Sequence, residues 1–347
     1  MNMLLTGGLG FQGSALTAAC LKSQHDVTVF AQSSIRSRQS AVRIMNSLDQ
    51  DVADGHARGS LSIVWGSIAS LSTLAATING CEPDVIVHMA AVANPEACRE
   101  DPQLAALVNI RGTQNVLEAF RAYAAAQPDS RRPRLLHIST CEVYGAPMFG
   151  VAQDEFAPMN PLHVYGATKL AADRLVNAYV HEFGLDVRIV RPCNVYGPGQ
   201  RSGPHGAVIP TMIDCTLSGG PILVHGTGAQ SREFIYVDDL VRVYLDLIER
   251  WPLFLGSPAL NLSAALPRTT INLLAMLVRD VVAEVTGPAS VVKIEHTGGR
   301  VAEPRDFDLS TRRAWSLNLV PPIPVTIREG IKRCVLHAIA QRNEKGA

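Results

Sequence analysis

The chain has 347 residues, more than one average domain, and its 47% hydrophobic content supplies ample material for a large core. Lysine plus arginine and aspartate plus glutamate number 31 each, and this balance argues against nucleic acid or an anionic membrane as a partner. The seven cysteines form no C-x-x-C pair, which disfavours a disulfide framework and a metal site. The first residues read as a strand entering a glycine turn, and no apolar run approaches the roughly 18 residues of a membrane helix. We therefore expect a cytoplasmic protein without bound metal.

Up to residue 192, short apolar runs alternate with longer helical patterns. The runs are nearly continuous rather than alternating, as expected for strands covered on both faces. The predicted strands span residues 3–5, 27–30, 61–66, 84–91, 134–140 and 187–192. The predicted helices span 12–23, 70–80, 103–125 and 161–183, with Pro102 and Pro161 near the starts of the last two. This alternation predicts an α/β fold with a Rossmann-type doubly wound parallel sheet.

A glycine-rich turn, "TGGLGFQGS", follows the first predicted strand. It places Gly7, Gly10 and Gly13 three residues apart, between a strand and a helix. Residues without side chains let the backbone approach a pyrophosphate, and the helix that follows offers free N–H groups and a favourable dipole. We therefore expect a dinucleotide to bind at this turn.

The end of the second predicted strand leaves the choice between NAD and NADP open. Enzymes that read the ribose 2′-hydroxyl of NAD usually carry an acidic residue there. Here Ala31 and Gln32 stand at that point, and Ser33, Arg36 and Arg38 follow. The serine and arginine side chains could hold a 2′-phosphate, or they could belong to an exposed loop.

The predicted strand 134–140 ends in a cluster of reactive side chains. Thr140 is its last residue, and Cys141 and Glu142 come directly after it. Open α/β sheets place their chemistry at the carboxyl ends of parallel strands. The alternative is an ordinary loop, in which Glu142 is solvated and Cys141 is a small buried filler.

Tyr165 and Lys169 form a candidate acid–base pair. They stand four residues apart in "VYGATKLAAD", so both lie on one face of the predicted helix. An ammonium beside a phenol stabilises the phenolate and lowers the pKa of tyrosine, which then acts as a base near neutral pH. Thr140, 25 residues earlier, could bind the same substrate hydroxyl. His88, by contrast, is expected to be a hydrogen-bonded core or loop histidine.

After residue 192 the composition changes. Glycine and proline cluster in 191–206 and 217–230, so loops are expected to dominate, with helices near 238–249 and 325–341. We expect a nucleotide-binding Rossmann domain and a smaller substrate-binding lobe with a cleft between them. The domain would comprise 1–190, with 232–255 returning to it, and the lobe would comprise 191–231 and 256–347.

Seven segments, in the expected order along the chain, resemble the extended short-chain dehydrogenase/reductase family. They are the glycine turn, "HMAA" (88–91), Asn109 in "VNIRGTQNVLEA", "STCEVYG" (139–145), "YGATK" (165–169), "RPCNVYGPGQ" (191–200) and "GTGAQSREFIYVDDLV" (226–241). The NAD-dependent nucleotide-sugar epimerase/dehydratase branch fits best. The resemblance covers nearly the whole chain.

This resemblance implies a tightly bound nicotinamide cofactor, a nucleotide-diphosphate sugar as substrate, and a homodimer formed through the helices predicted at 103–125 and 161–183. Family members oxidise C4 of the sugar, act on the 4-keto intermediate and often return the hydride. By this likeness Tyr165 would remove the 4-hydroxyl proton and Thr140 would hold that hydroxyl. Lys169 would lower the pKa of Tyr165 and bind the cofactor ribose.

The resemblance also implies two sets of binding residues. At the cofactor it places Gly7, Gly10, Phe11, Gln12, Gly13, Ser33, Arg36, Ser67, Ile68, Met89, Ala90, Ala91, Asn109, Tyr165, Lys169 and Pro192. At the diphosphate of the sugar nucleotide it places Asn194 and Arg232, with Arg300 or Arg305 as further candidates. Two residues depart from the family pattern: Ala31 replaces the expected acid, and Ser67 stands where an aspartate usually contacts adenine.

The pair after Thr140 separates the branches of the family. It is Asp-Glu in 4,6-dehydratases, typically Ser-Glu in uronate decarboxylases, and small or unreactive in 4-epimerases. Cys141-Glu142 resembles the pair in hexosamine 5,6-dehydratases. A carboxylate beside a ketone is the base that β-elimination requires, and a thiol of pKa about 8.5 can donate a proton weakly.

We therefore expect a nucleotide-sugar dehydratase in which Glu142 abstracts the C5 proton. One alternative is a 4-epimerase, in which Glu142 only shapes the pocket, and another is a nucleotide-uronate decarboxylase. Outside the enzymes, the alternative is a non-catalytic cofactor-binding protein, which predicts a damaged set of Thr140, Tyr165 and Lys169.

Overall fold

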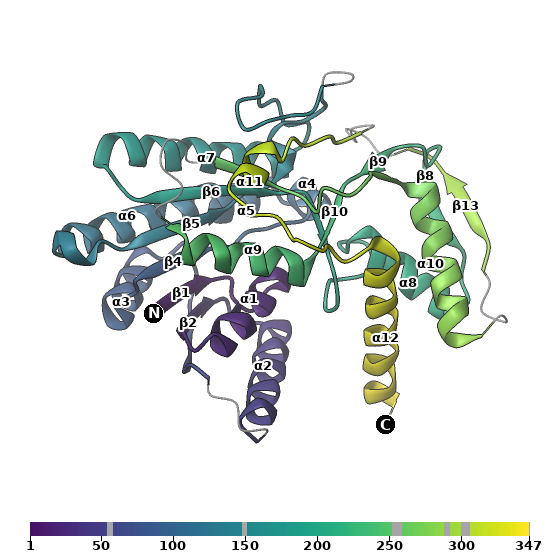
Figure 1. Ribbon diagram of the computed structural model, residues 1–347, viewed down its shortest axis with the longest axis horizontal. Coiled ribbons are helices and arrows are strands. Elements are labelled where there is room, and N and C mark those ends of the chain that lie inside the picture. The colour runs from purple at the N-terminus through teal and green to yellow at the C-terminus, as the bar shows by residue number, and fades with distance from the viewer. Residues whose placement is uncertain (54–57, 148–150, 252–258, 288–291, 300–305, 347) are drawn as a thin grey trace. The chain divides into compact units, whose positions relative to one another are not determined.

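The computed structural model describes residues 1–53, 58–147, 151–251, 259–287, 292–299 and 306–346 (Figure 1). The chain divides into two compact units. Unit 1 comprises Met1–Val143, Val164–Arg191 and Val243–Leu260, and unit 2 comprises Tyr144–His163, Pro192–Arg242 and Asn261–Ala347. Within the described ranges, no helix is both long enough and apolar enough to cross a membrane.

Unit 1 is built on the central sheet of the protein, which has seven strands in the order β11-β6-β5-β4-β1-β2-β3. The strands are β1 (Asn2–Thr6), β2 (Asp26–Ala31), β3 (Leu61–Trp65), β4 (Val85–His88), β5 (Arg134–Ile138), β6 (Val187–Pro192) and β11 (Ala259–Leu262). Neighbours from β3 to β6 all pair in parallel. The chain order reverses between β1 and β4, and such a switch point is where doubly wound sheets bind ligands. The predicted α/β fold class is confirmed.

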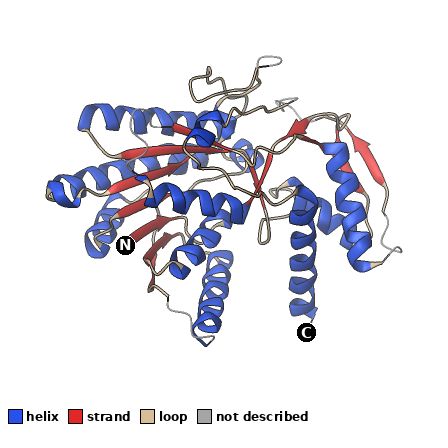
Figure 2. Ribbon diagram, in the orientation of Figure 1, coloured by secondary structure: helices blue, strands red, loops and turns tan. Residues whose placement is uncertain are grey.

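Helices lie on both faces of this sheet (Figure 2). On one face α3 (Leu71–Cys81), α6 (Gly112–Ala125) and α7 (Val164–Phe183) pack on the strands through a buried cluster that includes Phe120, Val176 and Leu135. The opposite face carries α1 (Phe11–Lys22), α2 (Ile35–Ala53) and α9 (Val237–Glu249). The near-continuous apolar strands follow from this double cover, because both of their faces are buried.

Two strands end two or three residues before their predicted ends. β4 ends at His88 and β5 at Ile138, so residues 89–91 and 139–142 lie in the loops beyond the carboxyl ends of the strands. Cys141–Val143 form the 3₁₀ turn η3. Thr140 therefore lies after β5 instead of ending it. The alternation that points strand side chains to one or the other face of the sheet does not apply to it.

The predicted helix 103–125 is interrupted. It consists of α5 (Pro102–Ala106), the π-helical turn η1 (Leu107–Arg111) and α6, and it is preceded by α4 (Pro95–Glu100). A π-turn inside a helix frequently occurs at functional sites. The predicted helix 161–183 begins later, at Val164, because residues 144–163 fold with unit 2; there the Asn160 amide donates to the Tyr144 carbonyl over 3.1 Å.

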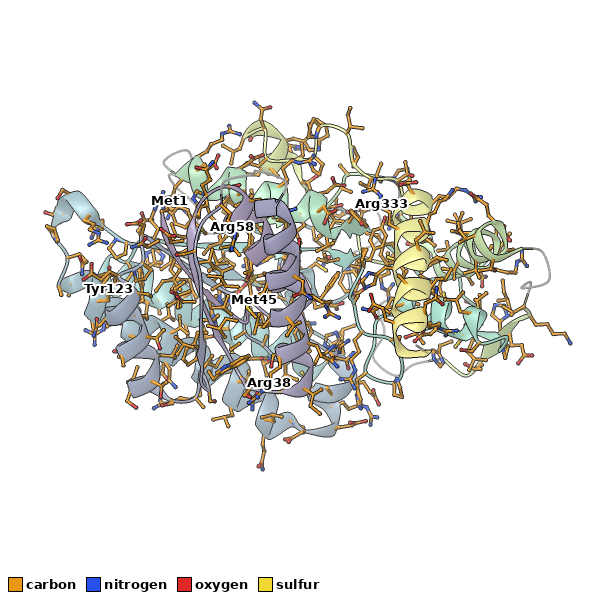
Figure 3. The ribbon with its side chains drawn as sticks, turned by 90° about the horizontal axis from the view of Figure 1, so that it is seen from below. Met1, Arg38, Met45, Arg58, Tyr123 and Arg333 are labelled. Atoms are coloured by element: carbon orange, nitrogen blue, oxygen red, sulfur yellow. The ribbon has the colours of Figure 1, made fainter. Side chains whose placement is uncertain are left out.

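Helix α2 is absent from the sequence prediction, which left the segment after β2 without a helix. The Ser34 hydroxyl accepts a hydrogen bond from the Ser37 amide at the start of this helix, and Ser40, Ala41 and Ile44 are buried in the part of it whose burial is described. Arg38 and Met45 project from α2 (Figure 3). The segment was not predicted as a helix because its polar residues outnumber the few apolar residues on its buried face.

Unit 2 is richer in helices than the sequence predicts. Beside the expected α12 (Ile327–Gly346) it contains α8 (Val208–Leu217), α10 (Ile271–Thr286) and α11 (Arg312–Ser316). Its core joins α8, α10 and α12, and Met212, Leu274 and Ile331 are buried there. The Thr270 hydroxyl caps α10 by accepting from the Leu273 amide. Loops therefore do not dominate this unit.

Three small sheets complete unit 2. β7 (Asn194–Tyr196) pairs in parallel with β10 (Phe234–Tyr236), and β8 (Ile222–His225) pairs in parallel with β13 (Ile294–Thr297). β9 (Ser231–Arg232) pairs antiparallel with β12 (Thr269–Thr270). A further 3₁₀ turn, η2 (Asp129–Arg131), precedes β5 in unit 1.

Candidate active site

The glycine turn after β1 is packed so closely that side chains are excluded. Gly7 has φ +73°, and a Cβ there would lie 2.8 Å from the Ala90 backbone nitrogen. A Cβ on Gly13 would lie 2.2 Å from the Gly7 carbonyl oxygen. Gly10 precedes the first residue of α1, and no side chain caps that helix. The turn therefore offers bare backbone and open N–H groups, which fit the pyrophosphate of a dinucleotide.

The other predicted cofactor residues of unit 1 lie at the carboxyl ends of the strands. Met89, Ala90 and Ala91 follow β4, and Ser67 and Ile68 lie between β3 and α3. Phe11 and Gln12 open α1, and the Gln12 side-chain oxygen accepts a hydrogen bond from the Tyr244 hydroxyl over 3.1 Å. A further predicted cofactor residue, Pro192, is the last residue of β6 and belongs to unit 2.

The segment after β2 is exposed and carries no carboxylate up to residue 38. Ala31, the last residue of β2, is buried, while Gln32, Ser33 and Arg36 are exposed. The Ser33 hydroxyl accepts from Nε and Nη2 of Arg38 over 3.2 and 3.1 Å. The same guanidinium lies 5.9 Å from the centre of the Trp65 ring.

Asn109 is fully buried within the π-turn η1. Its Nδ2 donates to the Val92 carbonyl over 3.1 Å and to the Thr168 hydroxyl over 2.9 Å, and its Oδ1 accepts from the Val92 amide over 2.8 Å. Asn109 thus ties the loop after β4 to α7. Both of its amide hydrogens are engaged in these bonds, and its predicted place at the cofactor stays a prediction.

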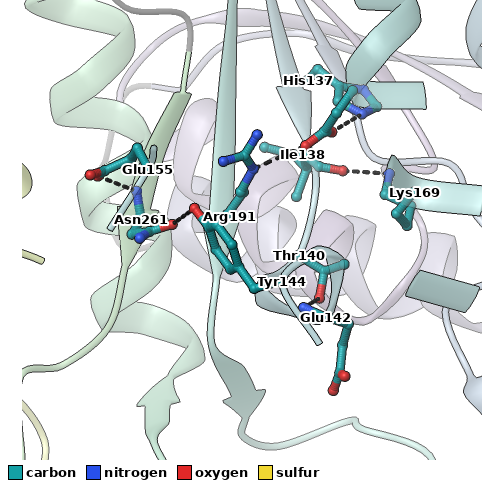
Figure 4. A network of polar contacts seen from close by, with 10 residues as sticks. His137, Ile138, Thr140, Glu142, Tyr144, Glu155, Lys169, Arg191 and Asn261 are labelled. Atoms are coloured by element: carbon teal, nitrogen blue, oxygen red, sulfur yellow. Dashed lines mark hydrogen bonds and ion pairs between the residues drawn. The ribbon is translucent and has the colours of Figure 1, made fainter. Parts of the chain in front are cut away.

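Thr140, Tyr165 and Lys169 come together as the sequence predicts. Tyr165 lies in the first turn of α7 and forms a hydrogen bond with the Thr140 side chain. The Lys169 Nζ donates to the Ile138 carbonyl over 2.8 Å, at the end of β5 (Figure 4). All three side chains are buried. The loop after β5 and the first turns of α7 thus form one candidate catalytic cluster.

Burial controls the protonation of this cluster. Burial raises the pKa of Tyr165, and the hydrogen bond from Thr140 opposes that effect. Burial lowers the pKa of Lys169 to about 8, and the Asp173 carboxylate opposes it. Burial thus opposes the predicted action of Lys169 on Tyr165, and this action stays a prediction. Further positive charge, as an oxidised nicotinamide carries, would favour the phenolate.

Cys141 and Glu142 lie beside the same phenol. Cys141 is buried and Glu142 is half-buried, and negative charge on either raises the pKa of Tyr165. The Glu142 amide donates to the Thr140 hydroxyl over 3.3 Å. The Glu142 carboxylate points away from Thr140 and Lys169 (Figure 4). A half-buried carboxylate next to a tyrosine can accept a proton from a substrate held at that tyrosine.

His88 is a hydrogen-bonded core residue, as predicted. Its two ring nitrogens contact the hydroxyls of Thr6, at 2.7 Å, and Thr113, at 2.9 Å. Burial lowers the pKa of His88, so its ring is neutral. Among the described residues, no group of three or more His, Cys, Asp and Glu side chains is arranged to hold a metal ion.

The sequence analysis missed a buried charged cluster behind Lys169. Arg191 Nε donates to Asp173 Oδ2 over 3.0 Å, and His137 Nε2 lies 3.5 Å from the other carboxylate oxygen. These three side chains are at most 1% exposed. A signal was available, because an arginine and a histidine stand inside the apolar strands "VRIVRP" and "RLLHI".

Two of the predicted substrate residues lie in unit 2. Asn194 opens β7, and its Nδ2 donates to the Glu233 carbonyl over 3.0 Å. Arg232 lies in β9, is buried, and holds its guanidinium 5.3 Å from the centre of the Phe307 ring. Arg300 and Arg305 lie outside the described residues.

Comparisons with known proteins all point to one enzyme family. Residues 3–252 match the model of the NAD-dependent epimerase/dehydratase family. A putative UDP-glucose 4-epimerase of Methanocaldococcus jannaschii is 27% identical over 96% of this chain and 97% of its own. A dTDP-glucose 4,6-dehydratase of Neisseria gonorrhoeae is 34% identical over 71% of this chain and 69% of its own.

A solved structure of similar fold is the dTDP-glucose 4,6-dehydratase of Streptomyces venezuelae with NAD and TYD bound. It superposes with a TM-score of 0.79 at 25% identity, over 99% of this chain and 98% of that one. The similar proteins thus include both epimerases and dehydratases.

Proposed function

The chain belongs to the NAD-dependent epimerase/dehydratase family, and we propose that it dehydrates a nucleotide-diphosphate sugar after transient oxidation at C4. The observation that carries this proposal is the position of Glu142. This residue is half-buried and comes two residues after Thr140 beyond the carboxyl end of β5, and negative charge on it raises the pKa of Tyr165. A base at that point is what removal of the C5 proton requires.

The cofactor of this reaction is NAD, whose pyrophosphate the glycine turn would hold through backbone N–H groups. A bound nicotinamide supplies hydride acceptance from C4 and hydride return. The absence of side chains at Gly7 and Gly13 supports this placement. A Cβ at either position would collide with neighbouring backbone, and side chains there would keep the pyrophosphate away from the backbone N–H groups.

The residues of the candidate cluster divide the proton transfers. Tyr165 takes the proton of the sugar 4-hydroxyl, which Thr140 holds by a hydrogen bond, and Lys169 supplies the positive charge that stabilises the phenolate. The resulting 4-ketone acidifies the C5–H bond, and Glu142 accepts that proton. The electron pair of the C5–H bond forms the C5–C6 double bond as the 6-hydroxyl leaves as water. Cys141 is the candidate acid that protonates the departing oxygen.

Unit 2 carries two proposed substrate-binding residues. Asn194 and Arg232 are the proposed ligands of the diphosphate, since a guanidinium can donate to two oxygens at once. We also propose a homodimer formed through α6 and α7. Leu104, Leu107 and Phe183 near these helices are 40–47% exposed apolar side chains that a partner surface would cover.

A 4-epimerase is the second candidate, because a putative UDP-glucose 4-epimerase matches the chain over nearly its full length. In that reaction Glu142 would only shape the pocket. The nucleotide-uronate decarboxylase and the non-catalytic protein have no such observation in their favour.

Replacement of Glu142 distinguishes these candidates. We expect Glu142→Gln to lower turnover of the accepted nucleotide sugar by about 10²–10⁴-fold while NAD binding is retained, because the amide cannot accept the C5 proton. Glu249→Gln, at an exposed acid that ends α9, is the matched control and should leave turnover unchanged. An E142Q variant with the activity of the wild type would show that Glu142 is not the base.

A further inference from the structure

The charged cluster behind Lys169 joins three elements of unit 1. Asp173 lies on α7 one turn after Lys169, Arg191 lies on β6, and His137 lies on β5 next to Ile138, whose carbonyl accepts from Lys169. Arg191 donates to one oxygen of the Asp173 carboxylate over 3.0 Å, and His137 approaches the other to 3.5 Å. Figure 4 shows these contacts beside Lys169.

Packing alone does not explain this arrangement. Removing an ion pair completely from water costs desolvation free energy that mutual attraction often fails to recover, and apolar residues of similar volume frequently serve stability as well. Arg191 and Asp173 are each at most 1% exposed. The presence of two charged side chains in the interior is better explained if they change the pKa of a neighbouring charged group.

That neighbour is the Lys169 ammonium. Its charged or titratable neighbours are Asp173, one turn further along α7, His88 on β4 and His137 on β5; Tyr165 lies one turn earlier on α7, and Arg191 on β6 pairs with Asp173. Burial lowers the pKa of both histidines, so they are neutral. Asp173 is therefore the negative charge of this set that opposes the loss of a proton from Lys169.

We propose that Asp173, fixed by Arg191, is a positioning residue that keeps Lys169 protonated in the working pH range and thereby sets the alkaline limit of catalysis. The inference rests on the proposed function, in which a charged Lys169 stabilises the phenolate of Tyr165. Burial already brings the pKa of Lys169 down to about 8. Without the Asp173 carboxylate, burial and the Arg191 charge would both favour the neutral amine.

The protonation of Lys169 can be measured without any turnover. The chain contains five lysines, so ¹³C-labelled lysine gives five Cε signals by NMR, and the one missing in Lys169→Met belongs to Lys169. We expect Asp173→Asn to lower the midpoint of the Lys169 titration by about one pH unit or more. The alkaline limb of the rate profile with the accepted nucleotide sugar should move down by the same amount.

Three variants separate this effect from a general loss of structure. Arg191→Met, which removes a positive charge, should move the Lys169 midpoint upward. Glu182→Gln removes an exposed carboxylate near the end of the same helix and should leave the midpoint unchanged. If Asp173→Asn does not fold, the double variant D173N/R191M, which removes both members of the buried ion pair, replaces it and should still lower the midpoint.

The titration tests the inference about Lys169, and the turnover assays test the proposed function, so either can be contradicted without the other. An unchanged Lys169 midpoint in D173N, or in the double variant, would overturn the inference even if the enzyme is a dehydratase. A lowered midpoint would support it even if no nucleotide sugar is dehydrated, because the NMR signal reports the amine directly.

Discussion

Tyr165 can act as a base only where something offsets its burial. The phenol is buried, its hydrogen bond to Thr140 favours the phenolate, and negative charge on Glu142 or Cys141 opposes it. Lys169 carries positive charge one turn further along the same helix, and burial lowers its own pKa to about 8. Burial thus opposes both charged forms that the proposed proton transfer uses, the phenolate of Tyr165 and the ammonium of Lys169.

The residues after β2 lead to a prediction about the cofactor. No carboxylate stands at Ala31 or Gln32, so a 2′-phosphate meets no like charge, and we expect NADP to bind within about tenfold of NAD. Gln32→Asp should weaken NADP binding at least about tenfold more than NAD binding, while Gln32→Asn should not discriminate. Isothermal titration with each dinucleotide measures both. If the wild type does not bind NADP, residues other than Ala31 and Gln32 must discriminate against the 2′-phosphate.

The turn between β1 and α1 gives a prediction for an element. A Cβ on Gly13 would meet the Gly7 carbonyl oxygen at 2.2 Å, so Gly13→Ala must displace the turn, and we expect NAD affinity to fall at least about tenfold. Gly80→Ala, on α3, is the matched control, because nothing lies within 4 Å of its added Cβ. It should bind NAD normally and stabilise the fold by up to about 1 kcal/mol. Equal NAD affinities in the two variants would remove the turn from the cofactor site.

The local pattern of apolar and polar residues predicted those elements in which the spacing of apolar residues follows the buried face. The apolar strands, the glycine turn and the Tyr165–Lys169 spacing are set by neighbours in sequence, and the structure contains all of them. Helix α2 escaped prediction because its polar residues outnumber the few that it buries. The π-turn also escaped prediction, and the hydrogen bond from Asn109 in this turn to Thr168 joins residues 59 apart, which local pattern does not encode.

The pair of Asp173 and Arg191 shows a second limit of sequence reasoning. Each residue stands in a segment whose type was predicted, the first in a helix and the second in a strand. Their 3.0 Å contact depends on how α7 lies across β6, and local periodicity does not encode that. A charge inside a doubly covered strand is nevertheless a signal that a buried partner must exist.

For the whole molecule, buried histidines predict how stability depends on pH. His88 and His137 are fully buried, burial lowers the pKa of both, and that of His137 falls to about 4. In the unfolded chain each takes up a proton near pH 6.5. Between about pH 6.5 and 4 the unfolded state therefore binds more protons than the folded state, and stability falls as the pH falls.

We expect each histidine to remove up to about 1.4 kcal/mol of unfolding free energy per pH unit in that window. Asp173, whose folded pKa is lowered by His137 and Arg191, adds stability that is present above its unfolded pKa near 3.9 and lost below it. Urea unfolding followed by circular dichroism at pH 7, 6 and 5 measures the slope, and His88→Asn should reduce it by roughly half. A stability that is constant from pH 7 to 5 would contradict buried neutral histidines.

The central claim is that this enzyme breaks the C5–H bond of its substrate. The most direct measurement is NMR of the sugar after incubation of the protein with UDP-, dTDP-, GDP- and CDP-sugars in deuterated water. We predict solvent deuterium at C5 or C6 together with loss of water, both abolished in Glu142→Gln. Inversion at C4 without exchange at C5 would contradict the account and identify an epimerase.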